Sequence, residues 1–95
     1  MTAYIVIDLD IADPEGMQEY IQAAAPLIVR MGGRMVGFDP QVRVLEGDWK
    51  PASLVLIEFP DQPAAQAFWD SAEYQPLKVL RQKHSQAKAI SVNAG

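Results

Sequence analysis

The segments AYIVI (residues 3–7) and LVLI (residues 54–57) decide the fold of this chain, because they are strand-like and apolar on both faces. A strand with one face in water alternates apolar and polar residues, and neither segment does so. The sheet that they form should therefore be covered on both sides. Helices are available for one side only, so we predict that a second copy of the chain covers the other side in a homodimer.

Length and charge limit the classes of protein to which the chain can belong. With 95 residues, we expect a single domain over residues 1–95, and a domain of this size buries only about 60 to 65% of its unfolded surface. An extensive dimer interface would add stability. The formal net charge is −4 and the eight basic residues are spread along the chain, which opposes binding to nucleic acid or to an anionic membrane.

The chain contains no cysteine, which excludes disulfides, thiolate zinc sites and a cysteine nucleophile. Near the N-terminus, Asp8 and Asp10 interrupt the apolar run. The run is then too short for the apolar core of a signal peptide or for a membrane span. We therefore expect a soluble, cytoplasmic protein.

The first strand and the helix after it carry clear local signals. In a strand over residues 3–11, alternate side chains share a face. The face expected to meet the helices is fully apolar and consists of Ile5, Ile7, Leu9 and Ile11. Asp13 followed by Pro14 predicts a helix start, because the Asp oxygen accepts from backbone amides and proline needs no partner there. Gly32 and Gly33 predict the end of this helix.

The middle of the chain leaves one question open. Residues 34–38 and 41–46 are both strand-like and are separated by Asp39 and Pro40. They could form a hairpin or one long strand with a bulge, and the sequence does not choose between the two. Residues 54–59 follow as the second strongly apolar strand.

The C-terminal third is predicted to contain two helical segments and a last strand. Asp61 caps the first helix, whose buried stripe is expected to comprise Ala65, Phe68, Trp69 and Ala72. The second helical segment carries Leu77, Leu80 and His84, and a strand over residues 87–93 closes the domain. Short connections and right-handed crossovers make this order an α+β, ferredoxin-like sandwich, an antiparallel sheet with helices on one face.

Five segments that span nearly the whole chain carry a family resemblance: AYIVIDLDIADPE (3–15), GGR (32–34), VLEGDW (44–49), VLIEFP (55–60) and FWDSAEYQPL (68–77). They resemble the domain of unknown function 1330 family, within the dimeric α+β barrel superfamily. The resemblance implies that two protomers press their sheets together into a dimeric α+β barrel. Members of that superfamily include cofactor-free monooxygenases, muconolactone isomerase and haem-degrading enzymes, so the resemblance assigns no catalytic residue.

A candidate pocket is predicted between the helices and the sheet. Tyr20, Trp69 and His84 lie on helix faces that should look toward the sheet, and such groups can line a pocket for a planar ligand. Each also has a structural interpretation, since aromatic rings at helical spacing pack in cores. His84, the only histidine, could close a helix C-terminus, or serve as a general base or haem ligand.

Glu58 shares a strand face with Leu54 and Leu56, the face assigned to the dimer. A carboxylate there needs a cation or hydrogen-bond donors, because an isolated buried charge is unfavourable. Arg34 and Arg43 are the nearest partners by topology, so we predict an interface ion pair. The alternative is a carboxylate that transfers protons.

No motif for a cofactor or a metal is present. Gly32 and Gly33 follow a helix rather than a strand, and neither a Walker nor a dinucleotide fingerprint occurs. Asp8 and Asp10 share a strand face but offer too few oxygens for calcium. We expect neither a cofactor nor a metal.

Two hypotheses for the function follow. In the first, a homodimeric α+β barrel protein binds a small apolar or aromatic metabolite in a helix-to-sheet cleft, with cofactor-free chemistry such as oxygenation or isomerisation. In the second, the dimer is a non-catalytic structural or regulatory module, and the polar residues named above only cap helices or stabilise the interface.

Overall fold

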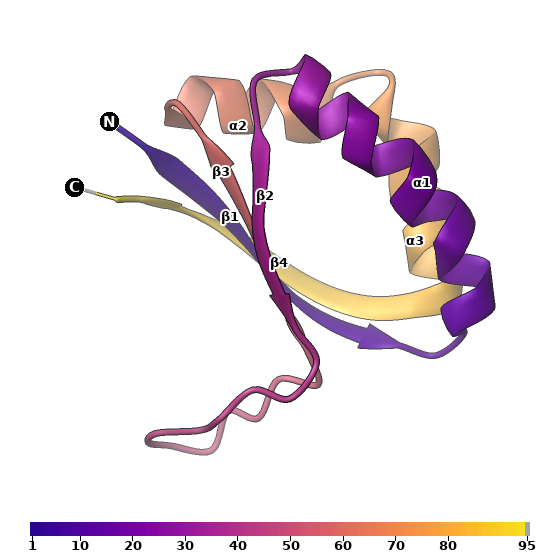
Figure 1. Cartoon of the computed structure of the whole chain (residues 1–95), viewed down its shortest axis with the longest axis vertical. Helices are drawn as coiled ribbons and strands as arrows, with labels where there is room; N and C mark the ends of the chain where they lie inside the picture. Colours follow the sequence, from indigo (N-terminus) through magenta and orange to yellow (C-terminus); the bar gives the residue numbers. More distant parts are fainter. Residues whose placement is uncertain (95) are drawn as a thin grey trace.

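The computed structural model describes residues 1–94 and shows an antiparallel four-stranded sheet with three helices on one face (Figure 1). Along the chain the elements are β1 (Ala3–Ile11), α1 (Pro14–Arg30), β2 (Arg34–Asp39), β3 (Leu54–Phe59), α2 (Gln62–Asp70), α3 (Tyr74–His84) and β4 (Ser85–Asn93). The strand order in the sheet is β2-β3-β1-β4. The predicted ferredoxin-like α+β sandwich is confirmed.

The two strongly apolar strands, β1 and β3, form the centre of the sheet. In their antiparallel register Ile5 pairs with Ile57 and Ile7 with Val55. All four side chains are buried under the helices. This confirms the predicted helix-facing side of β1, and it places the core between the sheet and the helical layer.

The other side of the sheet has no helix over it (Figure 1). We call it the open sheet face. Its apolar side chains come from β1, β3 and β4, and they are Tyr4, Val6, Leu54, Leu56, Ile90 and Val92. Ile90 is 61% exposed and Val92 is 42% exposed, so a single copy of residues 1–94 leaves this face apolar and open.

The predicted signals at both ends of α1 are confirmed. The Asp13 carboxylate accepts a hydrogen bond from the backbone amide of Gly16 at 3.2 Å, and Pro14 is the first helical residue. After the helix, Gly32 adopts a φ of +90°, a conformation that suits glycine. Gly33 is required for a different reason, because a Cβ there would lie 2.7 Å from the Phe59 ring.

The region after α1 differs from the prediction. β2 ends at Asp39 and residues 41–46 are not a strand, so neither a hairpin nor one long strand forms. A bulge does occur, between Met35 and Gly37, where the register of β2 against β3 shifts. β2 is an edge strand with β3 as its only neighbour in the sheet, and residues 41–46 leave the sheet without a strand to pair with. The connection over residues 40–53 extends away from the helices (Figure 1).

The second helical region follows the prediction in part. The Asp61 carboxylate accepts from the amide of Ala64 at 2.8 Å and caps α2. The expectation that Ala72 continues the buried stripe of α2 is wrong, because α2 ends at Asp70 and Ala72 is exposed. In α3, Tyr74 and Arg81 are buried, and the predicted Leu77 and Leu80 are partly buried and pack against the core.

Candidate functional site

An apolar cavity of about 300 Å³ lies between α1 and the helix-covered face of the sheet. We call it the α1 cavity. Its walls are built mainly from buried side chains of β1, α1 and β3, among them Ile7, Leu9, Met17, Ala24, Val55 and Ile57. Three further lining residues, Ile21, Met35 and Phe38, are each about half exposed. These three mark an opening between α1 and the edge strand β2.

Two polar side chains reach the α1 cavity, Tyr20 from α1 and Arg81 from α3. Arg81 is only 4% exposed. Its guanidinium carbon lies 5.8 Å from the centroid of the Trp69 ring, which covers one side of the charge. Within residues 1–94 the Arg81 Nε atom has no hydrogen-bond partner, and no carboxylate forms an ion pair with this side chain.

The Tyr20 hydroxyl lies 2.9 Å from the Tyr74 hydroxyl, in a buried hydrogen bond in which either oxygen can donate. The two rings meet edge to face, with centroids 6.4 Å apart. Burial raises the pKa of Tyr20 well above its usual range, with the Tyr74 hydroxyl adding to the rise and the nearby Arg81 charge opposing it. The Tyr20 hydroxyl is therefore protonated near neutral pH.

The polar end of the α1 cavity consequently holds more donors than acceptors. Two tyrosine hydroxyls share one hydrogen bond, so one of their two protons is left to be donated elsewhere. An arginine side chain has five N–H donors, no acceptor, and a charge that it keeps at all ordinary pH values. The Tyr20 oxygen can accept a hydrogen bond from Arg81, but within residues 1–94 no carboxylate pairs with the guanidinium.

The structure does not bring the three predicted pocket residues together. Tyr20 lines the α1 cavity, whereas Trp69 and His84 do not. His84 is the last residue of α3, and its Nδ1 lies 3.2 Å from the Asp13 carboxylate at the start of α1. Its backbone oxygen accepts from the amides of Ala12 and Asp13. His84 thus joins a helix end to a helix start.

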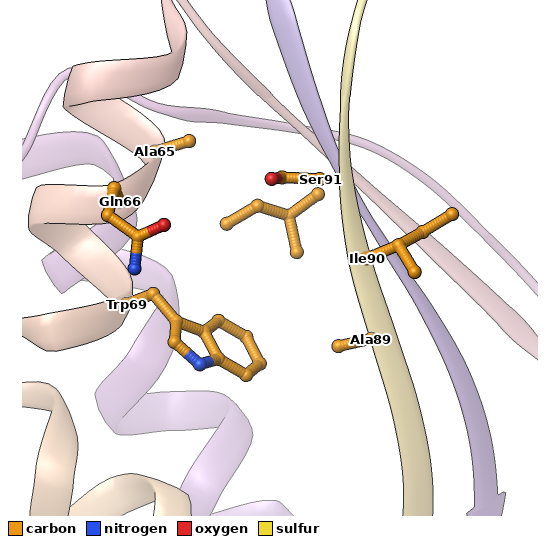
Figure 2. A pocket seen from close by; sticks show the side chains of 7 residues that line it. Ala65, Gln66, Trp69, Ala89, Ile90 and Ser91 are labelled. Carbon is orange, nitrogen blue, oxygen red and sulfur yellow. The ribbon is translucent and has the colours of Figure 1, made fainter.

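Trp69 lines a second cavity, of about 220 Å³, between α2 and β4. Figure 2 shows Trp69 and Gln66 of α2 opposite Ala89 and Ser91 of β4, while Ile90 points to the other side of the strand. This alternation places Ile90 on the open sheet face. The small side chains of β4 leave the space that forms the second cavity.

Glu58 has two partners on the open sheet face. The Arg34 guanidinium lies 3.3 Å from the Glu58 carboxylate, and the Tyr4 hydroxyl donates to the same carboxylate at 3.1 Å. The hydrogen bond to Glu58 and its negative charge raise the pKa of Tyr4. Arg43 is exposed in the 40–53 connection and forms no ion pair within residues 1–94. That this cluster lies in a dimer interface stays a prediction.

Neither Arg81 nor Tyr74 is among the pocket residues predicted from the sequence. A usable signal was present, because Tyr74, Leu77 and Arg81 recur at helical spacing and so share one face of α3. A single arginine on an otherwise apolar stripe points to a buried charge that needs an explanation.

Residues 1–94 contain neither a metal-binding cluster nor a membrane-spanning helix. No group of three or more His, Asp or Glu side chains in this range could hold a metal ion. In the same range, no helix combines the length and the apolar character needed to cross a membrane.

The fold and the α1 cavity define a ferredoxin-like α+β protein with an apolar cavity between helices and sheet that opens beside β2. The chain belongs to the domain of unknown function family DUF1330, whose model matches residues 2–94. Among curated proteins, none matches the chain at a significant level.

Several solved structures are similar over almost the whole chain. A protein of unknown function from Rhodopseudomonas palustris is 17% identical, with 98% of this chain and 82% of that chain covered and a TM-score of 0.72. SnoaB, a cofactor-independent oxygenase from Streptomyces nogalater, is 16% identical, with coverages of 99% and 92% and a TM-score of 0.66. A dimeric ferredoxin-like protein of unknown function from Jannaschia sp. CCS1 is 15% identical, with coverages of 99% and 100% and a TM-score of 0.67. At these identities the similarity establishes the fold alone.

Proposed function

We propose that this protein binds a small apolar or aromatic metabolite in the α1 cavity. The observation that carries the proposal is the cavity itself, which has apolar walls and an opening beside β2; among residues 1–94, Tyr20 and Arg81 are the only polar side chains that line it. Small-molecule sites are mostly apolar with a few placed polar groups. An apolar cavity of about 150 Å³ accepts benzene, so a volume of about 300 Å³ suits a ligand of roughly two rings.

Thermal shift with a panel of phenols, quinones, lactones and haem tests this proposal, since a ligand that binds only the folded state raises the melting temperature. Ala25 is exposed and lines the opening, so Ala25→Phe should block entry without disturbing the core. Ala23→Phe is the matched control, because Ala23 is exposed on the same helix and does not line the cavity. Stabilisation by a panel compound in the control, lost in Ala25→Phe, supports the proposal. No stabilisation by any compound contradicts it and favours a non-catalytic dimer module.

We also propose that the protein is a homodimer whose two open sheet faces pack against each other. The apolar side chains of that face support this, since an ordinary monomer does not leave such a patch in water. The similar protein from Jannaschia is described as dimeric. In this arrangement the Arg34–Glu58 pair would lie at the interface and fix the register of the two sheets.

Sedimentation of two variants tests the dimer. Ile90 on β4 and Val79 on α3 are both 61% exposed, but only Ile90 belongs to the open sheet face. Ile90→Glu should give a monomer at micromolar concentration and Val79→Glu should remain dimeric. Glu58→Gln should weaken the dimer, and an unchanged dissociation constant would show that the ion pair has no role there. A wild-type monomer would contradict the dimer outright.

Cofactor-free oxygenation is a second candidate, favoured by the similarity to SnoaB and by the donors at the end of the α1 cavity. O2 would be the oxidant and an activated methylene of the ligand the reductant. One oxygen atom becomes the new carbonyl, and the other leaves as water with the two methylene hydrogens. Stoichiometric O2 uptake with 2-tetralone, abolished in Ala25→Phe, is expected. Equal uptake by both proteins would exclude the cavity as the site.

A further inference from the structure

We propose that the ligand of the α1 cavity is an anion, a small apolar or aromatic carboxylate or an equivalent oxyanion, whose charged end pairs with the Arg81 guanidinium. The inference rests on the proposed function and names the chemical class of its ligand. It is carried by the buried guanidinium, which faces the cavity and has no carboxylate paired with it within residues 1–94.

The first step is the isolation of the charge. Arg81 is 4% exposed, and buried arginines are normally paired because an uncompensated buried charge is strongly unfavourable. The chain has twelve Asp and Glu residues, yet none of their side chains forms an ion pair with Arg81. By contrast, the exposed Arg30 on α1 pairs with Glu73 at 2.6 Å. Within residues 1–94, Arg81 is thus a buried arginine without a carboxylate partner, whereas Arg43, which also lacks an ion pair, is exposed.

The second step is the side from which a partner can approach the Arg81 guanidinium. Trp69 covers one side of the guanidinium, and the side chain also lines the α1 cavity together with Tyr20. The cavity is therefore where a partner can approach. Water there could accept hydrogen bonds from the Nε and the terminal nitrogens, but it would not neutralise the charge. An oxyanion does both, and the planar guanidinium fork fits a carboxylate with two parallel hydrogen bonds.

The third step is the fit of the rest of the ligand. The other lining residues are apolar, so the part of the ligand away from its charge must be apolar as well. The half-exposed Ile21, Met35 and Phe38 leave room for its far end at the opening. The spare proton of the Tyr20–Tyr74 pair provides one more donor for an oxyanion. These features together favour an amphiphilic anion over a neutral molecule or a free inorganic ion.

Matched probes test the inference. 2-Naphthoate and octanoate carry the charge, and their primary amides have the same shape without it. In titration calorimetry at pH 7.5, each acid should bind wild-type protein about ten- to a hundred-fold more tightly than its amide, the range expected for hydrogen bonds to charged groups. Arg81→Met should abolish this preference while retaining amide binding, and Arg81→Lys should retain part of it. Arg30→Met, at the exposed ion pair, should behave as wild type.

The outcomes distinguish a failure of the anion assignment from a failure of the proposed ligand binding in the α1 cavity. If acids and amides bind wild type equally, or if Arg81→Met and Arg81→Lys both keep the preference, the anion assignment is wrong and cavity binding stands. If neither acids nor amides bind, and no compound of the thermal-shift panel stabilises the protein, both the anion assignment and the proposed function are wrong. If Arg81→Met does not fold, the comparison of wild type with Arg81→Lys and Ala25→Phe decides, since Ala25→Phe should lose both ligands.

Discussion

Replacing Arg81 by methionine should make the folded protein more stable. The side chain is buried, lacks a hydrogen bond at Nε, and has no carboxylate partner within residues 1–94. Methionine is unbranched like the aliphatic stem of arginine and has no charge to desolvate. If Arg81 is present to bind a ligand, the unliganded protein carries a destabilising group that methionine removes.

The expected magnitude is the difference of two opposing effects. Replacing buried ionic groups by apolar ones of similar size stabilises proteins by about 1 to 4 kcal/mol. The substitution also removes the contact between the guanidinium and the Trp69 ring, which contributes about 0.5 to 2 kcal/mol. We therefore expect a net gain of about 1 to 2 kcal/mol. For a domain of this size that raises the melting temperature by roughly 5 °C or more.

Urea unfolding of ligand-free wild type and Arg81→Met, at equal protomer concentrations, measures this gain. Arg30→Met is the control, because the Arg30 and Glu73 side chains are 62% and 59% exposed, and such surface pairs contribute about 0 to 1 kcal/mol. An unchanged or lower free energy of unfolding for Arg81→Met would refute the reasoning. It would mean that Arg81 is a structural residue satisfied within the fold.

Three further predictions concern the core and the tyrosine pair. Tyr20→Phe and Tyr74→Phe should each lower the free energy of unfolding by about 1 to 2 kcal/mol. In a double-mutant cycle, the loss in the double variant should be close to that of one single variant and well below the sum of the two. Above pH 10 the Tyr20 hydroxyl loses its proton in the unfolded state, where its pKa is near 10, but keeps it in the folded state, where the pKa is raised. The free energy of unfolding should therefore fall as the pH rises above 10. The slope should be up to about 1.4 kcal/mol per pH unit and smaller in Tyr20→Phe; equal slopes would contradict the burial of that hydroxyl. Gly33→Ala should cost about 1 to 3 kcal/mol through its clash with Phe59, whereas Gly37→Ala, with no atom near its new Cβ, should be nearly neutral in the same denaturation assay.

The elements and their inward faces could be predicted from the sequence because their signals are local. Period-two apolar spacing marked the buried side of β1, and the caps at Asp13 and Asp61 marked the starts of α1 and α2. The fate of residues 41–46 depended instead on whether a neighbouring strand was available. β2 is the edge of the sheet, which only the assembled topology reveals.

The candidate site was predicted less well, because a cavity depends on how side chains from several elements pack. Tyr20 was selected, since its position on the inner face of α1 follows from helical spacing. Trp69 and His84 were predicted to share its inward-looking side, but Trp69 lines the second cavity opposite β4 and His84 lies beside the Asp13 carboxylate at the start of α1. Arg81 was overlooked because arginine is seldom buried, and its lack of a partner is visible only in three dimensions.

The most direct test of the account is a crystal structure of the protein purified from its native source without denaturation. We expect a dimer joined through the open sheet faces, with a bound molecule in each α1 cavity and one of its oxygen atoms within hydrogen-bond distance of the Arg81 guanidinium. A cavity filled by the protein's own side chains, or an Arg81 paired with a protein carboxylate, would contradict the account.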